Sequence, residues 1–171
     1  MRKYLRVLEA AILIGAAVFS LWYTRPQTIT ELCPGIDLGQ LNRIHGYYYF
    51  YNNSNKAGDD VPFELMKEDE PFAAILDSLE NREFRRSLRS FLPENSRSHR
   101  LEDGDCKWDI ILTFDRLNFP DGSTGSGDVL HIGNFFGQLT IYFNGESWRC
   151  STDDQADWIE SIIQHIRTKE A

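Results

Sequence analysis

The densest cluster of side chains that could do chemistry in this sequence is a group of arginines. Its members are Arg82, Arg85, Arg86 and Arg89. On a helix this spacing places them on one side, where like charges repel one another. The planar guanidinium group binds carboxylate and phosphate in a bidentate manner. We therefore expect these arginines to bind an anionic partner, unless Glu80, Glu83 and the acidic stretch 102–109 pair with them.

A helix is the element predicted to carry these arginines. Phe84, Leu88 and Phe91 have helical spacing, so residues 83–91 are expected to bury one face and expose the arginines on the other. Pro93 should end this helix, because proline cannot continue it.

Catalytic and metal motifs are not found in the sequence. The four histidines form neither H-x-x-x-H nor H-E-x-x-H. The glycine-rich stretch 122–127 lacks the lysine of a phosphate-binding loop, and no G-x-S-x-G is present. We therefore predict no catalytic residue, metal or cofactor. A pocket that gathers His45 or His131 with aspartates would instead favour an enzyme.

Two cysteines have mirror-image surroundings. Cys106 precedes Trp108 by two residues, and Cys150 follows Trp148 by two. If their strands pair in an antiparallel manner, a Cys106–Cys150 disulfide would form, as an exported domain permits. The Asn144-Gly145 hairpin signal occupies one edge of the last strand, so only the other edge is open to this pairing. Cys33 would then be unpaired.

The N-terminus combines a basic start with an apolar run. Arg2, Lys3 and Arg6 precede the apolar residues 10–23. This order is typical of a signal or a membrane anchor, and the basic end is expected to stay inside. We predict a membrane anchor or signal in residues 1–25, a linker in 26–35 and one extracytoplasmic domain in 36–171. The alternative is a domain secreted after signal cleavage.

Charge argues against nucleic acid as a partner. The chain of 171 residues has a net charge of −8. Residues 1–25 hold four basic side chains and one acidic one, so the rest holds 14 basic and 25 acidic side chains, a net charge of −11. Nucleic-acid binding needs a basic face, because the phosphates carry most of the affinity.

The periodicity of the remaining chain predicts an α+β domain with a mainly antiparallel sheet and two or three packed helices. Strands are expected at residues 43–51, 61–66, 108–114, 129–132, 139–143 and 147–150. Amphipathic helices are expected after Asp69 and after Asp153. Strands and helices come in blocks, which favours an antiparallel sheet over βαβ units.

Two segments carry a family resemblance. They are residues 36–44, "IDLGQLNRI", and residues 72–93, "FAAILDSLENREFRRSLRSFLP". The layout resembles small exported or membrane-anchored proteins of Gram-positive bacteria that have no assigned function. The resemblance implies the same α+β arrangement and an envelope location, and it brings no catalytic residues.

The sequence is compatible with three functions. The first is a non-enzymatic envelope module that binds an anionic protein, polymer or lipid through its arginines. The second is an envelope-associated hydrolase or other enzyme. The third is a partner of another membrane protein that uses the anchor and the aromatic run 47–51 as contacts.

Overall fold

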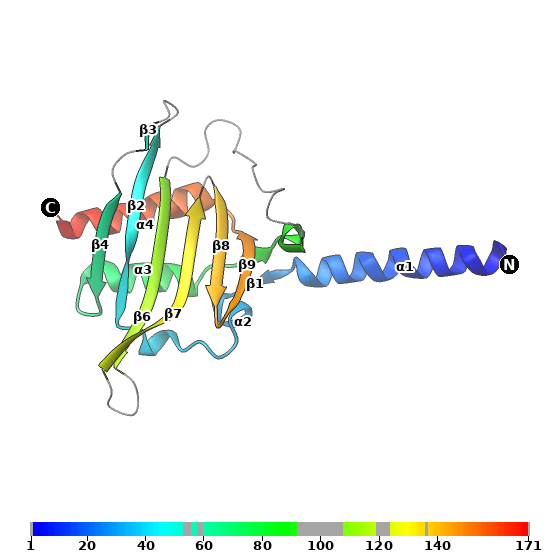
Figure 1. The fold of residues 1–171 in the computed structure, drawn as a ribbon, viewed down its shortest axis with the longest axis horizontal. Coiled ribbons are helices and arrows are strands. Elements are labelled where there is room, and N and C mark those ends of the chain that lie inside the picture. Colours follow the sequence, from blue (N-terminus) through cyan, green and yellow to red (C-terminus); the bar gives the residue numbers. More distant parts are fainter. Residues whose placement is uncertain are drawn as a thin grey trace.

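An antiparallel sheet backed by helices forms the body of the molecule, and a long helix extends from it at the N-terminus (Figure 1). The computed structural model describes residues 2–52, 56–57, 60–91, 108–118, 124–135 and 137–170. The predicted α+β class with a mainly antiparallel sheet is confirmed.

The sheet has the strand order β1-β5-β9-β8-β7-β6-β2, and β3 and β4 both pair with β2. Its strands are β1 (Pro26–Gln27), β2 (Arg43–Asn52), β3 (Lys56–Ala57), β4 (Val61–Met66), β5 (Phe84–Arg86), β6 (Trp108–Asn118), β7 (Thr124–Phe135), β8 (Gln138–Phe143) and β9 (Glu146–Ser151). The hairpins β2–β4 and β8–β9 form as their alternating patterns predict. The strands that flank the glycine-rich stretch are longer than predicted.

Helices cover one face of this sheet. The helical elements of the domain are α2 (Ile29–Leu32), α3 (Glu70–Glu80), α4 (Gln155–Glu170) and the short 3-10 turns η1 (Leu38–Gln40) and η2 (Leu88–Phe91). Figure 1 shows α3 and α4 side by side behind the sheet. The indole N–H of Trp158 in α4 donates to Ser78 Oγ of α3 at 3.3 Å.

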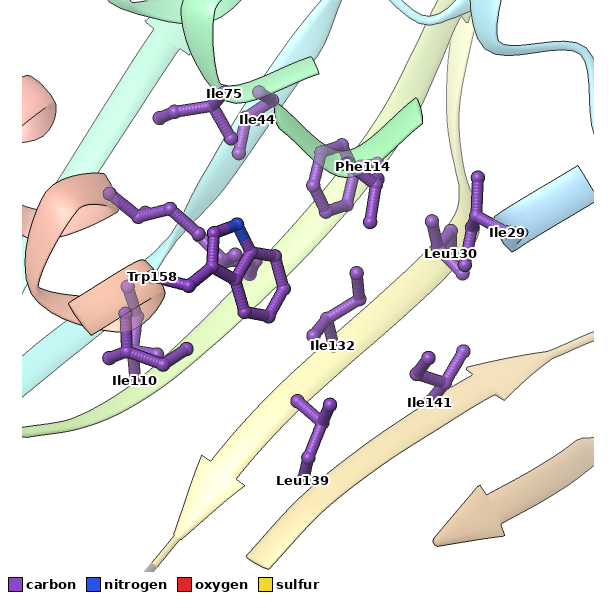
Figure 2. Close-up of a cluster of buried hydrophobic side chains, with 14 of the residues drawn as sticks. Ile29, Ile44, Ile75, Ile110, Phe114, Leu130, Ile132, Leu139, Ile141 and Trp158 are labelled. Carbon is purple, nitrogen blue, oxygen red and sulfur yellow. The ribbon is translucent and has the colours of Figure 1, made fainter. Parts of the chain in front are cut away.

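The core lies between the sheet and these helices. In β6, Ile110, Leu112 and Phe114 have no exposed surface. Figure 2 shows two of them, Ile110 and Phe114, in one cluster with Trp158 of α4 and with residues of β7 and β8. Successive strand residues point to opposite faces, so β6 turns Ile111 and Thr113 to the face that no described helix covers.

The β8–β9 connection is a tight turn whose geometry follows from its two residues. Asn144 and Gly145 have φ values of 51° and 84°. A type I′ turn needs positive φ at both central positions, and Asn-Gly is the pair that adopts it most readily. The register Phe143↔Glu146 confirms the hairpin that this pair predicts.

The N-terminal helix α1 (Arg2–Tyr23) projects away from the domain (Figure 1). Its segment Arg6–Tyr23 is long and apolar enough to cross a membrane, and only 6% of that segment is buried. Among the described helices it alone has this property. The expectation that α1 is a single helix with few contacts to the domain is met.

Residues 26–35, predicted as a linker, are part of the folded domain. Residues Thr28 and Glu31 form a capping box that starts α2. Ile29, Leu32 and Cys33 have no exposed surface. The linker prediction was wrong. A proline and polar residues at the start of the segment are typical of a linker, but the short apolar stretch that follows them is buried in the core.

The predicted helix over residues 83–91 is also wrong. The segment forms the strand β5 and then the 3-10 turn η2. β5 lies between β1 and β9, and the ladder continues as Ser87 N–H donates to the Arg149 carbonyl at 2.7 Å. A short amphipathic stretch is compatible with a helix or a strand. Here the strand is favoured because β1 and β9 offer backbone hydrogen bonds to it.

Candidate functional site

The four clustered arginines divide into two groups. Arg82 faces the start of α4, where its Nη1 donates to the Asp153 carbonyl at 2.5 Å and to Thr152 Oγ1 at 3.2 Å. Its guanidinium carbon lies 4.9 Å from the centre of the Trp158 ring. Burial lowers the pKa of Arg82, against the opposing effect of nearby acids. Arg82 therefore holds the fold together and is not part of an exposed cluster.

Strand geometry separates Arg85 from Arg86. Phe84 is fully buried in the core, and Arg85 beside it is exposed. Arg86 lies between two aromatic rings, with its guanidinium carbon 5.5 Å from the centre of Tyr23 and 5.4 Å from that of Trp148. Such contacts hold a cation by the negative face of each ring. The predicted sharing of one helix face by all four arginines is therefore wrong.

Three of the arginines still lie near the domain end of α1, with Arg85 and Arg86 on opposite faces of β5, and a fourth lies there as well. Arg25 follows the last residues of α1 and precedes Pro26, which pairs with Arg85 in the sheet. Arg89 lies on η2 and is exposed. We call Arg25, Arg85, Arg86 and Arg89 the arginine patch. Arg25 was not among the predicted binding residues, although its place directly after the apolar run puts a cation at the end of the anchor helix.

The arginine patch is not neutralised by the part of the domain that the structure describes. The ion pairs of this part of the chain involve Arg43, His45 and Lys169, and none involves a patch member. Arg86 Nε is buried and makes no hydrogen bond there. Arg25, Arg85 and Arg89 thus expose cations that no described carboxylate pairs with, while Glu102, Asp103 and Asp105 of the acidic stretch lie outside the described residues.

Exposed apolar side chains lie within the patch. Leu88 is 41% exposed and Phe91 is 62% exposed, and both belong to η2. Phe91 packs its ring 4.9 Å from that of Tyr23 and 6.1 Å from that of Phe19. The surface beside α1 therefore combines cations with apolar groups.

A second group of polar side chains lies on β2 and β6, which are far from β5 in the strand order of the sheet. Asp115 of β6 is fully buried and accepts a hydrogen bond from Arg43 Nε at 2.8 Å and another from Arg43 Nη2. His45 Nε2 lies 3.1 Å from the same carboxylate oxygen, Oδ2. The hydrogen bond to Asp115 raises the pKa of Arg43, so its guanidinium stays protonated.

This second group borders a shallow, open hollow of about 440 Å³. The hollow is lined by Arg43, His45, Gly46, Pro62, Phe63 and Glu64. A His–Asp pair can orient an imidazole as a general base, but Arg43 already occupies the Asp115 carboxylate. No group of three metal-ligand side chains is found among the described residues. The arrangement fits a charge pair that supports β2 and β6 better than a catalytic centre.

His131 and the aromatic run of β2 do not form a further site. His131 Nδ1 lies 3.0 Å from Thr113 Oγ1, and its ring packs against Tyr142. Strand β2 is paired on both sides, and Tyr48 within it is buried. The Tyr49 hydroxyl donates to Asp109 at 2.6 Å. Of the run predicted as a contact surface, Tyr48 is thus buried, Tyr47 and Tyr49 are half-buried and Phe50 is 42% exposed.

The strand pairing expected for a Cys106–Cys150 disulfide does not occur. Trp108 pairs with Phe50 of β2, whereas both edges of β9 are occupied by β8 and β5. Strands β7 and β8 separate β6 from β9, so Trp108 does not face Trp148. Cys106 itself lies outside the described residues.

Cys33 and Cys150 are buried free thiols. Burial raises the pKa of each thiol to about 12, which the positive charge of Arg86 partly offsets. Because the thiolate is the reactive form, about 1 in 10,000 of these groups is reactive at pH 8. We expect both thiols to react with Ellman's reagent roughly a thousandfold more slowly than a free cysteine.

This expectation is measured on the full chain carrying Cys106→Ser, so that only two thiols remain to be counted. Unfolding in denaturant should release both at the ordinary rate. Fast reaction of either thiol in the folded protein would contradict the burial. A missing thiol titre after unfolding without reductant would contradict it too, since that would reveal a Cys33–Cys150 disulfide.

A comparison with protein-family models, with curated proteins and with solved structures finds no match to this chain. Its function is therefore inferred from the geometry of its own residues.

Proposed function

We propose that this chain is a membrane-anchored, non-enzymatic binding module whose domain lies outside the cytoplasmic membrane and binds an anionic partner. The arginine patch carries this proposal. Its four cations gather at one end of an acidic domain, and no described carboxylate pairs with them. Arginine suits phosphate or carboxylate because its planar fork donates two parallel hydrogen bonds.

The exposed apolar surface of α1 supports the proposed membrane anchor. Its apolar surface is exposed along its length, with Leu13 at 71% and Leu21 at 74% exposed. Exposed apolar area of this extent needs a lipid or protein environment. Basic residues before the apolar segment favour an inner N-terminus and an outer domain. The competing arrangement is a signal that is cleaved and releases the domain.

Location is tested with the full chain carrying a C-terminal tag in a bacterial host. We expect the full-length product in the membrane fraction after an alkaline carbonate wash, and we expect protease added to spheroplasts to remove the tag. A soluble full-length product, or a tag protected from protease until lysis, would contradict the proposed topology. A shortened product in the medium would support the cleaved signal.

Binding is tested with the full chain in an uncharged, phosphate-free detergent, with short-chain polyphosphate as the anionic probe. The double variant Arg85→Gln/Arg89→Gln should weaken binding roughly tenfold at low salt, because two exposed cations are lost. The matched control Lys67→Gln/Arg167→Gln also removes two exposed cations, both outside the patch. The difference should shrink as salt screens the charges. Equal effects of the two variants would end the proposal.

An enzyme acting on envelope material is the alternative function. The proximity of His45 to Asp115 at a hollow is the observation that favours it. Loss of a hydrolytic activity on cell-wall material upon His45→Gln, with the fold retained, would support this alternative.

A further inference from the structure

The join between α1 and the domain is short. α1 ends at Tyr23 and β1 begins at Pro26, and Thr24 N–H still donates to the Ser20 carbonyl at 3.0 Å. The side chain of Tyr23 is only 9% exposed. In Figure 1 the green turn that follows β5 lies against the domain end of α1. The domain end of α1 thus packs against the domain through Phe19 and Tyr23.

The length of α1 fixes the depth at which this junction lies. The 18 residues from Arg6 to Tyr23 extend about 27 Å at roughly 1.5 Å per residue, slightly less than the about 30 Å of a hydrocarbon core. Both ends of a spanning α1 would therefore lie at the boundary between acyl chains and headgroups. Phe91, which contacts Phe19 and Tyr23, would lie at that boundary as well.

The chemistry of the surrounding surface matches this depth. Trp22 is 58% exposed at the end of α1, where interfacial aromatic residues gather in membrane proteins. Leu88 and Phe91 offer apolar surface to the acyl boundary. Arg86 of the arginine patch lies directly beyond the aromatic rings, with its guanidinium against Tyr23. Phospholipid phosphates occupy this level of a bilayer, next to the apolar region.

We infer that the arginine patch binds the phosphate groups of the phospholipids around α1, with Leu88 and Phe91 inserted beside them. This inference rests on the proposed function, since it names the anionic partner of the same patch. A soluble polymer would have to reach these arginines through the headgroup layer, whereas the lipids are held next to them by α1. The domain is therefore docked on the membrane surface in one orientation.

The test uses the full chain reconstituted in vesicles of phosphatidylcholine with or without about 30 mol % phosphatidylglycerol. A Leu88→Cys variant in a Cys106→Ser background carries an environment-sensitive fluorophore, while Cys33 and Cys150 are buried. Lipids with a spin label near the headgroup should quench this probe strongly. The same probe at Arg167→Cys, near the end of α4 that lies far from α1 in Figure 1, should be quenched little.

The double variant Arg85→Gln/Arg89→Gln should reduce quenching at position 88 at least twofold, and phosphatidylglycerol should no longer enhance it. Lys67→Gln/Arg167→Gln should leave quenching at position 88 unchanged. Equal quenching at positions 88 and 167, or no response to the patch substitutions, would overturn the lipid inference.

The proposed function fails separately. Polyphosphate binding that depends on the patch, without quenching at position 88, would retain the binding module and remove the lipid as its partner. Failure of the full chain to enter vesicles would instead contradict the anchor.

Discussion

Replacing Arg43 with glutamine is expected to lower the free energy of unfolding by about 3–5 kcal/mol, because it leaves a buried carboxylate without its cation. Asp115 has no exposed surface, and its Oδ1 has no hydrogen-bond partner among the described residues. Its Oδ2 accepts hydrogen bonds from Arg43 Nε and Arg43 Nη2. Among the described residues, His45 is the second partner near this oxygen.

Glu64 supplies a matched control for this prediction. Its carboxylate lies 3.3 Å from the same Arg43, but its side chain is 53% exposed. Exposed ion pairs contribute little, so Glu64→Gln should cost less than about 1 kcal/mol. Both variants are compared by urea unfolding of the full chain in one detergent, followed by tryptophan fluorescence.

A second variant keeps the Arg43 prediction testable if Arg43→Gln does not fold. The double substitution Arg43→Met/Asp115→Leu removes both charges and should recover most of the lost stability, because no unpaired charge stays buried. Equal losses from Arg43→Gln and Glu64→Gln would show that the Asp115 carboxylate is hydrated and that burial is not the cause.

Replacing Gly46 with alanine should cost about 3 kcal/mol or more, since overpacking against backbone leaves little room for adjustment. A Cβ at Gly46 would lie 1.9 Å from the Ile111 carbonyl oxygen and 2.9 Å from its carbon. Ile111 belongs to β6, which pairs with β2 on one side and β7 on the other, so its backbone cannot move away alone. The substitution would separate β2 from β6.

Gly133 of β7 is the control for Gly46. A Cβ there would meet only the Phe135 ring, at 3.2 Å, and a side chain can rotate away. Gly133→Ala should therefore stay within about 1 kcal/mol of the wild type, because alanine also loses less chain entropy than glycine. Thermal unfolding of the full chain should show a melting temperature lower by roughly 6–12 °C for Gly46→Ala. Equal melting temperatures for the two variants would contradict the close strand contact.

Strands β2, β4 and β6 to β9, the hairpin turn and the two main helices of the domain were predictable from the sequence because their signals are local. Alternation in residues 108–114 assigns the buried face of β6 without reference to any other strand. The Asn144-Gly145 pair specifies its turn through the φ values that these two residues tolerate. The apolar run of α1 likewise indicates an exposed helix by composition alone.

Residues 83–91 show what only the tertiary structure could decide. Their apolar spacing fits a helix, but the free edge of β9 and the arriving β1 offer hydrogen bonds that only a strand can use. That choice places Arg85 and Arg86 on opposite sides and brings Arg25, distant in sequence, next to them. Residue types alone determined that cations are present, while pairing between distant strands determined which of them lie near the domain end of α1.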